Sequence, residues 1–288
     1  LLKAGTVREA VAHYDTCSNL LRAELGIEPP VEMTQLIRRA RARAKPTPPT
    51  ATVRHNLPAV YDQFFGRKNI QHELHTRLDE PWCRLVTIVG PGGVGKTRLA
   101  TTIARSRLNH YADGVWLVEL AEIEPNDDDL VEAIAVEIAT ALDLRLAGAA
   151  TPVEQLLNHL EHKQLLLVLY NVEQLLAGLP LSLDLIQRCQ GVQLVVTSRE
   201  ALRIRAEWAV PLTGLGYPPD DSNAQHSDAV DLFVARQAQR QGARAVDDLA
   251  AMSQICRMVE GLPLAIELAA ALTQETTCRA VADQLQDG

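Results

Sequence analysis

Short apolar runs alternate with amphipathic stretches along the middle of the chain. The apolar runs are strand-sized, whereas the amphipathic stretches repeat their apolar residues at helical spacing. Such alternation predicts a parallel sheet with helices on both faces. The predicted strands are Leu85–Val89, Val115–Leu120, Leu165–Leu169, Leu194–Thr197 and Trp208–Leu212, and the predicted helices between them are Arg98–Leu108, Leu130–Leu142, Val153–His162 and Leu181–Cys189.

The pattern after Ser227 is helical to the end of the sequence. Apolar residues at helical spacing predict three helices there, which we interpret as a small lid over residues 226–288. These helices are Ala229–Gln241, Leu249–Val259 and Leu264–Thr273. We therefore expect an α/β domain over residues 59–225, followed by the lid.

Residues 1–45 are a separate helical segment in the pattern, with helices expected at Val7–Leu25 and Val31–Ala44. Two helices cannot bury both apolar faces, and their spacing resembles the C-terminal part of a tetratricopeptide-like (TPR-like) repeat, whose neighbours supply the missing surface. Residues 46–58 begin with a proline-rich stretch that ends the helix, so we interpret them as a linker. On this view the sequence is a piece of a longer protein.

Charge and composition exclude several classes of protein. The net charge of -8 argues against a chain that is mainly a nucleic-acid binder. The basic run Arg38–Lys45 fits a contact with a DNA backbone, but a solvated helix end is the interpretation that we favour. The five cysteines are scattered and favour a reducing cytoplasm over a disulfide framework or a zinc site. No apolar run approaches the roughly 18 residues of a membrane span, so no membrane partner is expected.

Residues Gly90–Thr97 fit the pattern G-x-x-x-x-G-K-S/T directly after a predicted strand, which is typical of a phosphate loop. Inner glycines allow backbone turns in which consecutive N–H groups point at nucleotide phosphates. Lys96 supplies charge for the β- and γ-phosphates, and Thr97 offers a hydroxyl to Mg²⁺ at the positive end of a helix. The candidate nucleotide-binding residues of this segment are Gly90, Gly92, Gly93, Val94, Gly95, Lys96, Thr97 and Arg98.

The end of the predicted strand Leu165–Leu169 lacks the acid that an ATPase normally presents there. The next residues are Tyr170 and Asn171, both uncharged at neutral pH, and a phenol is a poor ligand for Mg²⁺. Glu173 is the nearest acid downstream, and we favour an exposed glutamate at a helix start over a role in activating water. The residues support nucleotide binding and do not support hydrolysis.

Arg199 follows the predicted strand Leu194–Thr197 at the edge where open α/β sheets bind ligands. A guanidinium there gains a charge-assisted contact only when a terminal phosphate is present, so it can distinguish ATP from ADP. A surface arginine paired with Glu200 is the alternative, which the nearby phosphate loop makes the weaker one.

Five motifs together resemble the NB-ARC type of STAND signalling ATPases: Phe65-Gly66-Arg67, Gly90–Thr97, Leu165–Glu173, Thr197-Ser198-Arg199 and Gly261-Leu262-Pro263-Leu264. They occur in the order and spacing of that family. The chain is similar in particular to large bacterial transcriptional regulators in which such a module follows a bacterial transcriptional activator domain. Residues Ala4 to about Ala44 resemble the end of that activator domain.

The resemblance implies that ADP or ATP is held between the sheet and the lid. By position, it assigns Phe65 and Arg67 to the adenine side and Pro263 to packing on the base. It assigns phosphates and Mg²⁺ to Lys96 and Thr97 and sensing of the γ-phosphate to Arg199, and these three form the expected catalytic set. Tyr170 stands where the family has aspartate, so we expect weakened Mg²⁺ binding at Thr97 and at most a slow ATPase.

We therefore expect a nucleotide-controlled switch in a bacterial transcriptional regulator. ADP would clamp the lid closed, and exchange to ATP, promoted by an upstream signal, would open it for self-association or for contact with a polymerase. Other domains of the same longer chain are further expected partners. DNA would be bound only through a domain outside these residues. One alternative is an interaction scaffold that no longer uses nucleotide; a conventional ATPase or phosphotransferase is disfavoured by the uncharged pair Tyr170-Asn171.

Overall fold

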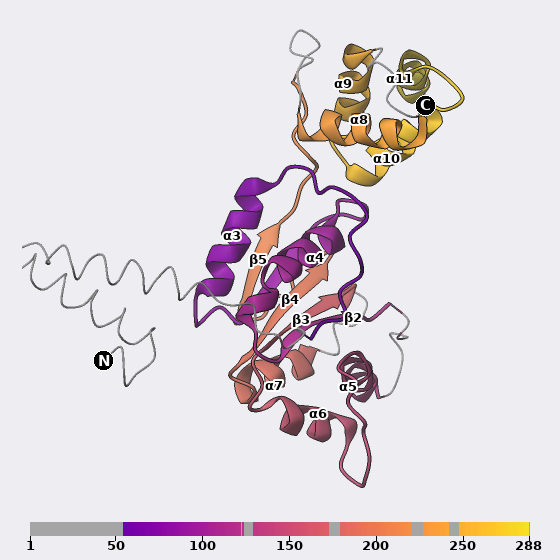
Figure 1. Cartoon of the computed structure of the whole chain (residues 1–288). Helices are drawn as coiled ribbons and strands as arrows, with labels where there is room; N and C mark the ends of the chain where they lie inside the picture. Colours follow the sequence, from indigo (N-terminus) through magenta and orange to yellow (C-terminus); the bar gives the residue numbers. More distant parts are fainter. Residues whose placement is uncertain are drawn as a thin grey trace, which may run out of the picture. The chain divides into compact units, whose positions relative to one another are not determined.

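The computed structural model describes residues 54–121, 123, 129–172, 179–219, 227–241 and 248–287 (Figure 1). The chain divides into two compact units, Leu1–Thr52 and Val53–Gly288, and every described residue belongs to the second. The helical segment expected at residues 1–45, most of the expected linker and Glu173 lie outside the described residues.

A five-stranded parallel sheet forms the centre of the second unit, with the strand order β2-β3-β4-β1-β5. Strand β1, which leads into the phosphate loop, lies between β4 and β5. The strands are β1 Leu85–Val89, β2 Gly114–Glu119, β3 Leu165–Tyr170, β4 Val192–Ser198 and β5 Glu207–Pro211. All five predicted strands are confirmed, with shifts of one or two residues at some ends.

Helices cover both faces of this sheet because its strands alternate their side chains between two apolar cores. In β3, Leu165, Leu167 and Leu169 lie in one core, whereas Leu166, Val168 and Tyr170 lie in the other. The first core is covered by α5 Leu130–Ala141, α6 Pro152–Leu160 and α7 Leu179–Arg188, and the second by α3 Lys68–Asp79 and α4 Lys96–Ser106 (Figure 1). The predicted α/β fold is therefore confirmed.

Four helices follow the sheet and pack around a core of their own, which includes the fully buried Phe233. These lid helices are α8 Asp228–Gln241, α9 Leu249–Met258, α10 Pro263–Leu272 and α11 Cys278–Asp287. Phe65, from the segment before α3, packs against this core, whereas its neighbour Phe64 packs against the core of the sheet. The two phenylalanines thus join the start of the α/β domain to both the sheet and the lid.

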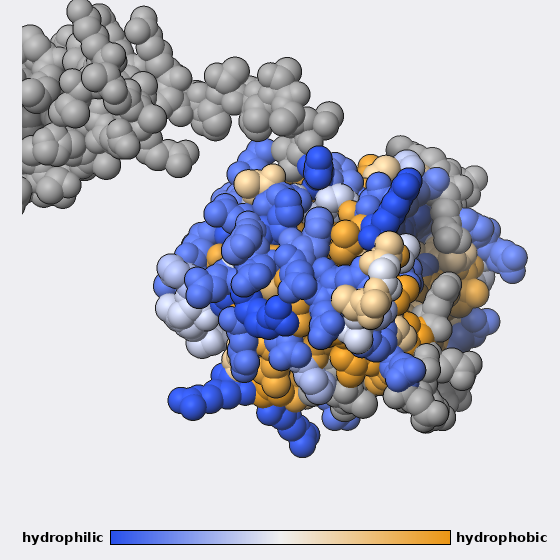
Figure 2. Space-filling model, turned by 90° about the horizontal axis from the view of Figure 1, so that it is seen from below, coloured by the Kyte–Doolittle hydropathy of each residue, from blue (hydrophilic) through white to orange (hydrophobic). Residues whose placement is uncertain are grey.

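Most of the molecular face in Figure 2 carries hydrophilic residues, with hydrophobic residues visible between them. Scattered apolar residues of this kind are ordinary on a protein surface. Within the part of the chain that the structure describes, every helix is too short or too polar to cross a membrane.

Candidate functional site

The phosphate loop connects β1 to α4 through backbone that only glycine adopts at low cost. Gly93 and Gly95 have φ angles of 75° and 90°, in the left-handed region. Gly95 also caps α4, without a side-chain hydrogen bond to the first-turn amides and without an acid in the first turn. The positive end of the helix therefore faces the loop with its amides available to an anion.

Lys96 and Thr97 begin α4 directly behind this loop. The Lys96 side chain is mostly buried, and its Nζ donates to the carbonyl oxygens of Gly90, at 2.8 Å, and Pro91, at 3.0 Å. The ammonium is thus held inside the curve of the loop. Thr97 is exposed, which leaves its hydroxyl accessible from the loop side.

A cavity of about 480 Å³ lies between the phosphate loop and the lid. This is within the size range of sites for small molecules and cofactors. Apart from Gly90, all the residues expected from the sequence to bind nucleotide line it, including Phe65, Arg67, Arg199 and Pro263. Gly90 anchors the start of the loop to the end of β4, because its amide donates to Ser198 O at 3.2 Å.

Arg67 connects the phosphate loop to the segment after β5. It precedes α3 with a φ of 60°, and its Nη2 donates to Val94 O in the phosphate loop and to Thr213 O at 3.2 Å. Its Nη1 is buried and has no hydrogen-bond partner among the described residues. Burial lowers the pKa of Arg67 to about 10, against the opposing effect of Asp228, so the side chain stays charged at neutral pH. A buried charged donor without an acceptor fits a site that awaits an anionic or polar ligand.

The lid touches the phosphate loop through its backbone. The amide of Leu264, the second residue of α10, donates to Gly93 O at 3.2 Å. The approach is close enough that a Cβ on Gly93 would lie 2.9 Å from the Leu264 Cβ. This contact closes one side of the cavity.

The segment after β5 is anchored at two nearby positions, once to the sheet and once to the lid. The amide of Leu212 donates to Val89 O in the sheet at 2.6 Å, and the amide of Leu215 donates to Gly261 O in the lid at 2.8 Å. Thr213 and Gly214 stand between these two anchored positions, and we call them the hinge. Arg67 therefore contacts both the phosphate loop and the hinge.

The Tyr170 hydroxyl contacts α4 and does not supply the carboxylate that an aspartate would offer at this position. It is buried, and its Oη lies 2.8 Å from Oγ1 of Thr101, one turn along α4 from Thr97. Burial raises the pKa of Tyr170 to about 12, so the phenol stays neutral. Asn171, which lines the cavity, is uncharged as well, and the described residues hold no cluster of three or more His, Cys, Asp or Glu side chains suited to a metal ion. At positions 170 and 171 the site therefore offers uncharged side chains, which are weaker ligands for Mg²⁺ than carboxylates.

Six further cavity residues were not in the predicted set: Phe64, Asn171, Leu215, Leu232, Leu264 and Glu267. Phe64, Leu215 and Leu232 are apolar and carry no signal beyond helical or strand patterning, whereas Asn171 and Leu264 belong to motifs named above without an assigned role in binding. Glu267 did carry one, because it is the single charged residue of the apolar helix Pro263–Leu272. It lies one turn after Pro263, on the same side of α10.

Comparisons with known proteins agree with this geometry. Residues 67–203 match the model of the NB-ARC domain. A protein of Mycobacterium tuberculosis, named Uncharacterized protein Rv0894, is 31% identical over 274 residues, covering 93% of this chain and 60% of the relative. Another, named Putative HTH-type transcriptional regulator Rv0890c, is 35% identical over 209 residues, covering 71% of this chain and 22% of that protein. The chain thus spans about 60% of the length of the first relative and less of the second.

A solved structure shares the fold. Cdc6p from Pyrobaculum aerophilum superposes with a TM-score of 0.54 at 17% identity, over 76% of this chain and 65% of that one. At this level of identity the likeness concerns the fold alone.

Proposed function

Because residues 67–203 are an NB-ARC domain, we propose that this chain is the nucleotide-controlled switch of a bacterial transcriptional regulator. Residues 59–225 form its nucleotide-binding domain, and residues 226–288 begin its lid. ADP favours the closed lid, and exchange to ATP opens it. The naming of a relative as a putative transcriptional regulator supports the regulatory setting.

The observation that carries this proposal is a cavity with one wall from the sheet domain and one from the lid. Gly93, Lys96 and Arg199 line it from the sheet side, and Pro263 and Leu264 line it from the lid. A ligand shifts a conformational equilibrium only by its different affinity for the two states. A nucleotide that touches both walls in the closed form binds that form more tightly than the open one. Arg199 adds a further difference in affinity, which depends on the γ-phosphate.

ATP hydrolysis contributes little to the proposed switch. Tyr170 and Asn171 supply no carboxylate to hold Mg²⁺ or to activate water. Lys96 and Thr97 serve to bind phosphate, and Thr97 is a weak ligand for Mg²⁺ by itself. The switch is reset by nucleotide exchange more than by turnover, which makes the module at most a slow ATPase.

The opened form exposes surface for self-association and for other domains of the same longer chain. DNA is bound through a domain outside these residues. The dispersed cysteines, of which Cys83, Cys189, Cys256 and Cys278 are buried, agree with a cytoplasmic setting.

Calorimetry tests nucleotide binding directly. ADP and ATP are titrated with and without Mg²⁺ into the chain and into Tyr170→Asp, with Lys96→Ala as the variant that removes the phosphate-binding charge. We expect tight ADP binding that hardly depends on Mg²⁺, gains Mg²⁺ dependence in Tyr170→Asp and weakens in Lys96→Ala. Absence of binding by both the parent chain and Tyr170→Asp would sink the switch and leave a nucleotide-independent scaffold.

Hydrogen exchange at single amides, followed by NMR, tests the opening. The Leu264 amide lies in the first turn of α10, so it has no partner within its own helix and depends on Gly93 O across the boundary. The Ile266 amide donates to Leu262 O inside the lid and serves as the matched control. With ADP bound, Leu264 exchanges slowly; with a non-hydrolysable ATP analogue it exchanges faster, while Ile266 does not change. Equal protection of Leu264 with both nucleotides contradicts the switch.

A further inference from the structure

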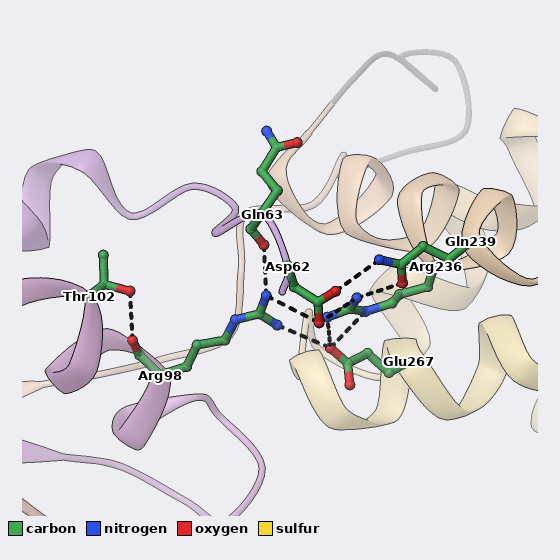
Figure 3. A network of polar contacts seen from close by, with 7 residues as sticks. All are labelled: Asp62, Gln63, Arg98, Thr102, Arg236, Gln239 and Glu267. Carbon is green, nitrogen blue, oxygen red and sulfur yellow. Dashed lines mark hydrogen bonds and ion pairs between the residues drawn. The ribbon is translucent and has the colours of Figure 1, made fainter. Parts of the chain in front are cut away.

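A cluster of charged side chains borders the cavity where three parts of the chain meet (Figure 3). Arg98 comes from α4, Asp62 from the segment before α3, and Arg236 and Glu267 from lid helices α8 and α10. Arg236 bridges the two carboxylates, with 3.0 Å from Nη1 to Asp62 Oδ2 and 3.0 Å from Nη2 to Glu267 Oε1. Arg98 lies 3.6 Å from Glu267 and 3.8 Å from Asp62. Two positive and two negative charges therefore balance.

Within this cluster, Glu267 has an unused oxygen. Both arginines contact its Oε1, while its Oε2 accepts no hydrogen bond from the described residues. Of the two carboxylates, Glu267 lines the cavity and Asp62 does not. Its side chain is 33% exposed, so part of it is accessible to a ligand. An accessible carboxylate oxygen at a cavity wall suits a ligand group that donates a hydrogen bond.

The neighbours of Glu267 indicate which ligand group that is. Phe65, Leu232 and Pro263 line the cavity with apolar side chains suited to a base. The phosphate loop leads into Arg98, the third residue of α4. Glu267 lies one turn of α10 beyond Pro263 and contacts Arg98, so it neighbours both the apolar residues and the phosphate-binding segment. The part of a nucleotide that connects base and phosphates is the sugar, and its hydroxyls are donors.

We propose that Glu267 recognises the ribose of the bound nucleotide by accepting a hydrogen bond from a sugar hydroxyl. This inference rests on the proposed nucleotide binding and adds a specificity-determining residue to it. Arg98 and Arg236 hold the carboxylate and neutralise it, so that it does not repel the phosphates nearby. The sugar contact then lies on the lid, and a ligand with a ribose stabilises the closed form more than its deoxy analogue does.

The test compares ADP with 2′-deoxy-ADP and 3′-deoxy-ADP by calorimetry on the full chain. Glu267→Ala removes the proposed acceptor, and Glu267→Gln keeps the side-chain shape with a weaker, neutral acceptor. Asp62→Ala is the matched control, because it removes one carboxylate from the same cluster without changing the cavity wall. Inosine diphosphate completes the set, since it lacks the amino group of adenine and retains the ribose.

We expect the parent chain to bind at least one deoxy analogue about tenfold more weakly than ADP. In Glu267→Ala the ratio of the Kd for the deoxy analogue to the Kd for ADP falls to about one, and in Glu267→Gln it lies between one and the parent value. In Asp62→Ala the parent ratio persists, even if the affinities for ADP and for the deoxy analogue both drop. The Gln variant keeps the test valid if the Ala variant does not fold.

Three results overturn the assignment to ribose: a parent chain that binds the deoxy analogues as tightly as ADP, discrimination that survives in both Glu267 variants, or variants that lose discrimination against inosine diphosphate instead. A parent chain that binds no ADP at all refutes the proposed function itself, which the ADP titration distinguishes from a failure of the sugar contact.

Discussion

Replacing Arg67 by alanine separates two contributions of one guanidinium group. Its Nη2 donates to Val94 O and Thr213 O, whereas its buried Nη1 has no partner among the described residues. A hydrogen bond from a charged donor contributes roughly 1.5–3 kcal/mol. The substitution removes both Nη2 bonds, which destabilises the protein, but it also removes a buried charge with an unused donor, which offsets part of that loss. The net effect lowers the unfolding free energy of the nucleotide-free protein by about 2 kcal/mol. If Nη1 donates to bound nucleotide, the Kd for ADP rises about 10- to 150-fold.

Two assays measure these effects separately. Urea denaturation without nucleotide gives the change in unfolding free energy, and calorimetry gives the Kd for ADP at a temperature where the variant is folded. Arg145→Ala is the control, because Arg145 is an exposed arginine outside the cavity; it should leave both quantities unchanged. If Arg67→Ala loses stability but keeps its ADP affinity within about twofold of the parent value, Arg67 only braces the loop and the hinge, and the ligand role of Nη1 is refuted.

Three further predictions concern the surroundings of the site. Tyr170→Phe removes the hydrogen bond to Thr101 and lowers the unfolding free energy by about 1 kcal/mol, measured by urea denaturation, with ADP affinity retained. Gly93→Ala places a Cβ against Leu264 at a φ of 75°, so ADP binding weakens by about tenfold or more in calorimetry while the lid helices keep their circular dichroism. Burial and the nearby Arg107 lower the pKa of His75 from its ordinary 6.5, so the unfolded chain binds the proton more readily. Stability is therefore full above pH 6.5 and falls as the pH drops through and below that value, and His75→Gln reduces this slope in denaturation curves measured between pH 5 and 7.5.

The strands were predictable because a strand that is buried on both faces has a continuous run of apolar residues. Every residue of β3 is buried, so Leu165–Leu169 is a continuous apolar run. The sequence pattern of helix α3 is much weaker. Of its twelve residues only Leu74 and Leu78 are buried, and it begins after Arg67 in a left-handed conformation, without the Ser, Thr, Asp or Asn cap that usually signals a helix start.

The phosphate side of the cavity was predictable for a different reason. Residues Gly90–Thr97 are consecutive, so the geometry that makes them a phosphate loop is local. The cluster around Glu267 is not local, because Asp62, Arg98 and Arg236 come from three other segments of the chain. Their pairing depends on how the lid packs against the sheet domain, which periodicity does not report. The hinge likewise became visible only through the separate anchoring of Leu212 and Leu215.

The attachment of the lid fits the proposed control by a nucleotide. The apolar core of the lid is distinct from the two cores of the sheet domain, and residues such as Phe65, which packs against the lid core, and Leu262 of the lid, which packs against a sheet core, join them. Polar contacts also join the lid to the sheet domain, among them the backbone hydrogen bond from Leu264 to Gly93 and the ion pair of Arg98 with Glu267, whose side chains are 35% and 33% exposed. Contacts of these two kinds contribute about 1 kcal/mol or less each. A ligand that binds only the closed form and is present at 100 times its Kd contributes about 2.7 kcal/mol, which is more than these two contacts together. On the proposed function, occupation of the cavity therefore adds substantially to the protein contacts that keep the lid closed.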